Sequence, residues 1–186
     1  MELQDALSET VSIMDGLVAG LTPEHREMTT PCKQFTVHDL MNHTVNTCKL
    51  VGAIVSGQPE NVPAEGVDHL AEGPAQGWTD GKAALQSAAT AENLELVRET
   101  PFGEVPGAVP MSVAVSDVLV HAWDLARATG QPVEASDDLA AFAQGTWEMV
   151  IRPEARNGDA FDEVQPCPDD ASALDRVAAF TGRSVS

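Results

Sequence analysis

The stretch MSVAVSDVLVHAWDLARATGQP, residues 111–132, decides the fold. It predicts a helix over residues 112–128, capped at its start by Ser112 and ended at Gly130. Apolar residues cover most of the circumference of this helix, so it belongs in the interior of a helical protein. Its polar stripe must then face either water or a polar cavity. That stripe consists of Asp117, His121 and Asp124.

The rest of the chain shows the same helical periodicity and no sustained period-two alternation. We therefore predict an all-α fold. The first four helices form a four-helix bundle over about 1–130, and a helical C-terminal extension over about 131–186 completes a single domain of 1–186. The helices expected besides 112–128 span about 3–20, 36–57, 79–100, 137–152 and 172–181.

Turn and cap signals separate these helices. Thr36 and Asp39 have the spacing of a capping box, and Gly57 marks the end of the helix that they begin. Residues 58–77 are predicted to be a polar loop rich in proline and glycine. Residues 101–111 are a second Pro/Gly connector, with a short hairpin as the alternative.

Composition limits the classes of partner. Of 186 residues, 43% are hydrophobic, so the chain can bury a substantial core. The formal net charge is −19, which repels the phosphates of nucleic acids and anionic membrane surfaces. No apolar run approaches the roughly 20 residues that span a bilayer. We expect no nucleic-acid partner and no membrane association.

The cysteines favour a reducing compartment. There are three, with no CxxC pair, which is neither a disulfide framework nor a thiolate zinc site. The N-terminal stretch MELQDALSETVSIMDGL carries acids where a signal peptide needs basic residues. We predict a cytoplasmic protein. Cys32 and Cys48 are expected to be packing residues, with a redox role as the alternative for Cys32, and Cys167 receives no role.

The polar stripe predicts half of a metal site. Asp117 and His121 lie one helical turn apart, so both side chains can reach one point in space. A carboxylate and an imidazole at this spacing can chelate zinc or another divalent ion, and His43, in the helix over 36–57, is the best third ligand. The alternatives are an exposed helix face for the pair and a packed or surface histidine for His43. The poorer histidine candidates are His25, His38 and His69.

Two further polar residues follow the pair. Asp124 has two interpretations of equal weight, a carboxylate that orients a metal-bound imidazole or one half of a surface ion pair with Arg127. Arg127 is the candidate for binding an anionic cofactor or substrate, with a solvent-exposed arginine as the alternative. Trp123 points to a different face and is expected in the core.

Three segments of the chain resemble a known family. TPCKQFTVHDLMNHTV (30–45) and VSDVLVHAWDLARATGQP (115–132) are similar to the two signature segments of the mycothiol-dependent maleylpyruvate isomerase-like metal-binding domain, part of the wider DinB/YfiT-like metalloenzyme superfamily. DASALDRVAAFTGR (170–183) resembles the terminal segment of a functionally uncharacterised actinobacterial branch.

The resemblance implies a DinB-like four-helix bundle that holds a divalent metal, usually zinc, between its second and fourth helices. The histidine of the NH segment is His43, and the acid–x–x–x–His pair is Asp117 and His121. The isomerase has Glu where this chain has Asp117, which is one methylene shorter, so this carboxylate is expected to bind the metal directly, through water, or from behind another ligand.

The resemblance also implies a chemistry. The metal binds the sulfur of a low-molecular-weight thiol, mycothiol, for transferase or isomerase reactions, so the expected partners are a small-molecule thiol and an electrophilic substrate. A homodimer is the expected assembly. The isomerase has an additional C-terminal domain that this chain is too short to copy in full, and the alternative is a non-catalytic helical module that binds a metal or small ligand.

Overall fold

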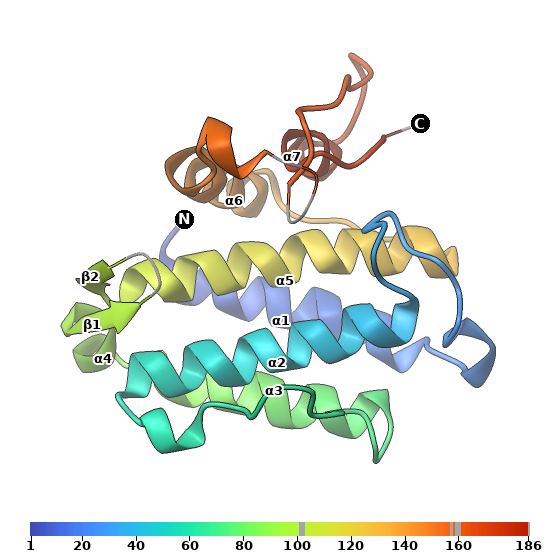
Figure 1. The fold of residues 1–186 in the computed structure, drawn as a ribbon. Coiled ribbons are helices and arrows are strands. Elements are labelled where there is room, and N and C mark those ends of the chain that lie inside the picture. Colours follow the sequence, from blue (N-terminus) through green and yellow to red (C-terminus); the bar gives the residue numbers. More distant parts are fainter. Residues whose placement is uncertain (101–102, 157, 159–160, 186) are drawn as a thin grey trace.

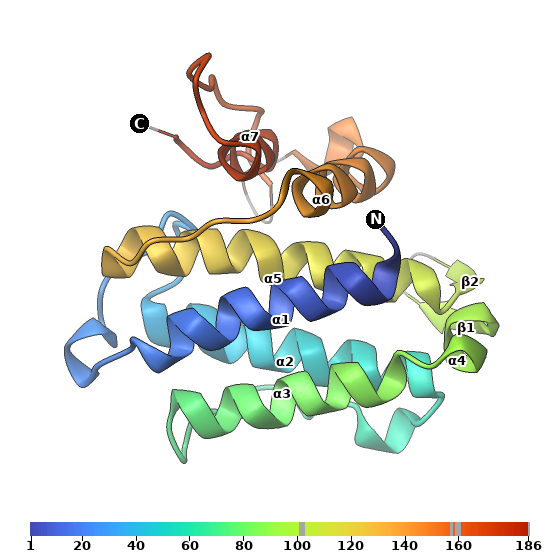
Figure 2. The same ribbon diagram turned by 180° about the vertical axis from the view of Figure 1, so that it is seen from behind.

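In the computed structural model, four long helices run side by side and form the bundle expected from the sequence (Figure 1, Figure 2). The structure describes residues 1–100, 103–156, 158 and 161–185. The four helices are α1 (Leu3–Ala19), α2 (Val37–Ser56), α3 (Pro74–Ala88) and α5 (Ala108–Thr129). The prediction of an all-α, DinB-like fold is confirmed, and the only strands among the described residues form one small hairpin.

Helix α5 is the centre of the molecule. It packs against α1 and α2 on its bundle side and against α6 (Asp137–Val150) and α7 (Ala173–Phe180) on the other. Figure 1 shows this layering, with α6 and α7 on the side of α5 away from α2 and α3. Being covered on both sides, α5 buries polar residues of its stripe as well as its apolar ones. A carboxylate or imidazole buried in this way needs a specific partner.

Local signals fix the ends of α2 as expected. The Thr36 hydroxyl accepts a hydrogen bond from the backbone N–H of Asp39 at 3.2 Å, and the Asp39 carboxylate accepts one from the N–H of Thr36 at 3.1 Å. This reciprocal pair is the predicted capping box of α2. Gly57, at φ 70°, ends the helix in the left-handed conformation that glycine adopts without strain.

The prediction of one helix over 79–100 is wrong at both ends. Helix α3 begins earlier, at Pro74, and ends at Ala88; a short helix α4 (Ala91–Glu95) and a strand β1 (Val97–Thr100) follow. The break has a local cause, because Asn93 donates its side-chain amide to the carbonyl of Ala88 at 3.1 Å, and the Thr90 hydroxyl caps α4.

The hairpin alternative for the 101–111 connector is confirmed in part. Strand β2 (Gly103–Pro106) lies in the connector and pairs antiparallel with β1, which precedes it; Pro101 and Phe102 lie outside the described residues. The following helix begins at Ala108 rather than at Ser112. Its first turn contains Pro110, whose missing N–H costs nothing at a helix N-terminus.

The remaining connections are mostly irregular. Short 3-10 turns lie at Pro23–His25 (η1), Pro59–Asn61 (η2) and Pro153–Ala155 (η3). The loop expected over 58–77 contains η2 and runs into the first turn of α3.

By length and composition alone, α5 could cross a membrane, contrary to the expectation that no apolar run is long enough. In the fold, however, 72% of its apolar window is buried inside the protein. Its apolar character is accounted for by its place at the centre of the core.

Candidate metal centre

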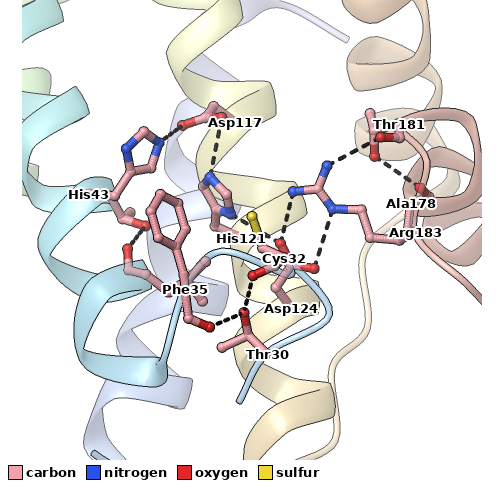
Figure 3. A network of polar contacts seen from close by, with 12 residues as sticks. Thr30, Cys32, Phe35, His43, Asp117, His121, Asp124, Ala178, Thr181 and Arg183 are labelled. Atoms are coloured by element: carbon pink, nitrogen blue, oxygen red, sulfur yellow. Dashed lines mark hydrogen bonds and ion pairs between the residues drawn. The ribbon is translucent and has the colours of Figure 1, made fainter. Parts of the chain in front are cut away.

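Asp117 lies between two histidines from two helices. Its Oδ1 is 3.5 Å from Nε2 of His121, one turn further along α5, and its Oδ2 is 3.7 Å from Nε2 of His43 on α2. Figure 3 shows the two imidazoles on either side of the carboxylate. The three residues that the sequence nominated as metal ligands are thus brought together by the packing of α2 against α5.

The spacing of these donors fits a divalent metal ion. Two atoms bound to one tetrahedral zinc ion at about 2.0–2.1 Å lie about 3.4 Å from each other, whereas a hydrogen bond would draw them to about 2.9 Å. One ligand atom from each residue lies within 4.8 Å of the other two. In addition, Asp117 Oδ2 is buried without a hydrogen-bond partner among the described residues. An unpartnered buried oxygen is costly unless it binds something else.

The electrostatics of the site favour the ligating form of the carboxylate. Burial alone would raise the pKa of Asp117, but the facing imidazoles of His121 and His43 outweigh burial and lower it to about 2. Burial alone would likewise lower the pKa of His43, but Asp117 outweighs it and raises that pKa. Asp117 is therefore ionised at neutral pH, the state in which a carboxylate binds a metal.

Packing holds the two imidazoles in place. The rings of His43 and His121 meet edge to face, with centroids 5.1 Å apart and planes at 86°. The Phe35 ring lies against His43 at 5.1 Å and against His121 at 6.5 Å. Phe35 comes from the segment just before α2, inside the stretch that carries the family resemblance, but the sequence analysis assigned it no role.

Asp124 supports His121 from behind. It is 0% exposed, and its Oδ2 lies 3.1 Å from Nδ1 of His121. The surface ion pair with Arg127, one of its two predicted interpretations, does not form. Instead Asp124 pairs with Arg183, which is only 8% exposed: Nη2 donates to Oδ2 at 3.0 Å and Nε to Oδ1 at 3.3 Å. Burial would raise the pKa of Asp124, but the bonds to His121 and Arg183 keep it low.

Arg127 lies elsewhere. Its guanidinium donates to Asp175 of α7 at 2.9 Å and stacks over the Trp123 ring at 5.0 Å. Trp123 is buried as predicted and donates its indole N–H to the same carboxylate at 2.7 Å. Arg127 is absent from the residues that line the cavity beside the metal ligands, so its predicted role in binding a cofactor gains no support from the geometry.

A cavity of about 280 Å³ opens beside the three candidate ligands. The ligands themselves and Arg183 supply polar groups to its wall. The other lining residues are Cys32, Gln34, Phe35, Val120, Trp147 and Phe161. Trp147 and Phe161 come from the C-terminal extension, as does Arg183, and the sequence alone predicted no role for any of them. The available signal was the buried acid itself, because Asp124 on an apolar helix requires a cation as its partner.

A second set of donors lies on the other side of His121, formed by Cys32, His121 and Asp124 within 4.8 Å of one another. The Arg183 guanidinium already occupies the oxygens of Asp124, and its positive charge opposes a metal ion there. Burial raises the pKa of the Cys32 thiol, which keeps it protonated. Cys48 is fully buried, as expected of a packing residue.

The remaining histidines lie away from the three ligands. His38 contacts Arg26 at 3.1 Å and His69 contacts Asn46 at 3.2 Å, while His25 accepts a hydrogen bond from the backbone N–H of Thr22, just before η1. None of them belongs to either group of candidate metal ligands among the described residues.

Fold and site together define a class: a helical bundle with two histidines and one carboxylate converging beside a small cavity. Comparison with known proteins identifies the family. Residues 7–126 match the model of the mycothiol maleylpyruvate isomerase N-terminal domain, and the chain belongs to this family.

The curated relatives are mycobacterial. The chain is 32% identical over 179 residues to the uncharacterized protein Rv0738 of Mycobacterium tuberculosis strain H37Rv and, equally, to the uncharacterized protein MT0763 of strain CDC 1551, and each match covers 91% of both chains. No solved structure gives a significant match. The similarity extends beyond the family domain into the C-terminal extension.

Proposed function

We propose that the protein is a divalent-metal-dependent enzyme that uses a low-molecular-weight thiol, mycothiol, for transferase or isomerase chemistry. The observation that carries this proposal is the convergence of His43, Asp117 and His121 at metal-ligand spacing. One oxygen of that carboxylate also accepts no hydrogen bond from the part of the chain that the structure describes. Zinc is the metal we expect, because two imidazoles and a carboxylate are a common catalytic zinc set.

His43, Asp117 and His121 would hold the zinc ion, which would supply the chemistry that makes a thiol a thiolate nucleophile at neutral pH. The task of the protein's own residues is to bind and orient the metal. Three protein ligands leave a further coordination position for the sulfur. The direct reach of Asp117 to both imidazoles favours it as a ligand itself, despite its being shorter than glutamate. No cysteine of this protein needs to act as the nucleophile.

The cavity sets what can approach the site. Phe35, Phe161 and Trp147 give it apolar walls, and the cavity is large enough for a small electrophile. The Arg183 guanidinium lies at its edge, although Asp124 already neutralises that charge. We therefore expect a compact electrophilic substrate that is held mainly by shape and apolar contact.

Metal analysis tests the site. Reconstituted wild-type protein and the control His25→Ala, altered outside the site, are expected to hold about one zinc ion per chain. His43→Ala and His121→Ala are expected to lose most of it. Zinc content that is equal in all four proteins would exclude the assigned ligands.

A thiol assay tests the chemistry. Mycothiol is mixed with a panel of electrophiles, and its consumption is followed with and without zinc. Zinc-dependent turnover that disappears in His121→Ala supports the enzyme. Zinc-dependent binding of the thiol without turnover indicates the alternative, a non-catalytic metal- or ligand-binding module.

The proposal includes a cytoplasmic location and a homodimeric assembly. All three cysteines are free, which fits a reducing cytoplasm. The homodimer stays a prediction that light scattering of the purified chain would test.

A further inference from the structure

We propose that Arg183, from the segment after α7, is a positioning residue of the metal site that selects which nitrogen of His121 binds the metal. This inference rests on the proposed function, since it concerns the same site. It assigns a role to the C-terminal extension, which lies outside the residues matched by the family domain.

The contacts form a chain from Arg183 to the metal ligands. The guanidinium grips both oxygens of Asp124, at 3.0 and 3.3 Å, and so fixes the plane of that carboxylate. The oxygen that faces Nη2 also faces Nδ1 of His121, at 3.1 Å. Figure 3 shows this series of contacts, from Arg183 through Asp124 and His121 to Asp117.

This arrangement selects a tautomer. Both carboxylates that face His121 only accept hydrogen bonds, but Asp124 Oδ2 is within hydrogen-bond distance of Nδ1 at 3.1 Å, whereas Asp117 is 3.5 Å from Nε2. The shorter contact therefore places the proton of a neutral His121 on Nδ1. The lone pair is then on Nε2, the nitrogen that faces Asp117 at 3.5 Å. The ring is thereby presented to the metal in its ligating form before any ion arrives. Carboxylates that hydrogen-bond to a metal-binding imidazole in this way typically contribute 10–100-fold to metal affinity.

The position of Arg183 is itself fixed by the extension. Gly182, at φ 98°, turns the chain after α7, and a Cβ placed there would lie 2.6 Å from Cβ and 2.7 Å from the backbone N of Asp162. The Arg156 guanidinium links the two segments that cross here, because it donates to the carbonyls of Asp162 and Phe180 at 2.8 and 2.9 Å. An alanine at 182 would therefore displace Arg183 without changing its chemistry.

The test measures zinc affinity, by chelator competition, and the His121 tautomer, by ¹⁵N NMR of the histidine-labelled, metal-free protein. The main variant replaces both partners, Asp124→Leu with Arg183→Met, because this leaves no unpaired buried charge and allows the fold to persist. We expect zinc affinity to fall about 10-fold or more and the Nδ1–H form of His121 to lose its dominance.

Further variants separate positioning from folding. Arg183→Lys keeps the charge but loses the two-point grip, and we expect an intermediate loss of affinity. Gly182→Ala should weaken zinc binding in the same direction, whereas Gly145→Ala, at a helical glycine with open space around it, is the matched control and should not. Thermal melting of each variant verifies that it is folded.

Two results would overturn the proposal. One is a folded double variant that binds zinc within about twofold of the wild type, a change well below the loss expected when the partner of a metal-binding imidazole is removed. The other is an unchanged Nδ1–H tautomer in that variant. If the wild-type protein binds no zinc, the proposed function fails, and the tautomer measurement alone then decides whether Arg183 orients His121.

Discussion

The two sides of His121 differ in how completely their polar groups are satisfied. On the Nε2 side, the contacts to Asp117 and from Asp117 to His43 are 3.5 and 3.7 Å long, and Asp117 Oδ2 has no hydrogen-bond partner within the described ranges. On the Nδ1 side, Asp124 and Arg183 make contacts of 3.0–3.3 Å at almost no exposure. The open side has room for a ligand, and the closed side is structural support. Completeness of hydrogen bonding therefore separates binding groups from supporting groups within one cluster.

The closed side should be costly to break. Asp124→Ala leaves the Arg183 guanidinium buried without its counter-charge, and we expect the free energy of unfolding to drop by about 3–5 kcal/mol. Urea denaturation measures it, with His43→Ala as the comparison from the open side. A loss for Asp124→Ala no larger than that for His43→Ala would remove the distinction between the two sides.

The open side should instead respond to metal. Free zinc at about 100 times its dissociation constant is expected to stabilise the wild-type fold by about 2.7 kcal/mol, because it binds only the folded site. Denaturation with and without zinc measures the gain, which chelation should reverse. His121→Ala should show no gain. Equal stabilisation of this variant would place the zinc elsewhere.

For Asp175, on the C-terminal extension, we expect a loss of stability of intermediate size. Burial alone would raise its pKa, but hydrogen bonds from Trp123, Ser172 and Arg127 keep it below the usual value. We expect Asp175→Asn to destabilise the fold by about 1–2 kcal/mol at neutral pH.

The pH dependence checks the cause of that loss. The carboxylate of Asp175 contributes stability above its unfolded pKa, and the contribution disappears as the pH falls through its lower folded pKa. The difference between Asp175→Asn and wild type should therefore shrink below about pH 4. A difference that is constant down to acid pH would show that charge is not its origin.

The smallest effect is expected at Arg127, which is matched to Arg183 by chemistry but not by burial. Its side chain is 47% exposed, so Arg127→Met should cost less than about 1 kcal/mol. Zinc affinity should stay at the wild-type value, as measured by the same chelator competition. A clear loss of zinc affinity would instead place Arg127 among the residues that support the metal ligands.

The candidate ligands were accessible from sequence because they depend on short-range geometry. The spacing of Asp117 and His121 places both on one face of any α-helix, and His43 lies in the middle of another helix that ends at recognisable caps. Family resemblance pointed to the same three residues. The helix over 79–100 was misjudged because continued helical periodicity hid the interruption at Thr90 and Asn93.

The sequence by itself determined that the protein is helical, that α5 is its core helix, and that three polar residues can meet between two helices. Only the tertiary structure decided which partner the buried Asp124 takes. The sequence offers Arg127 three residues away, yet the chain brings Arg183 from 59 residues away. The physical reason is burial: α6 and α7 cover that face of α5, and the charge of a fully buried carboxylate is compensated by whichever cation the fold buries beside it.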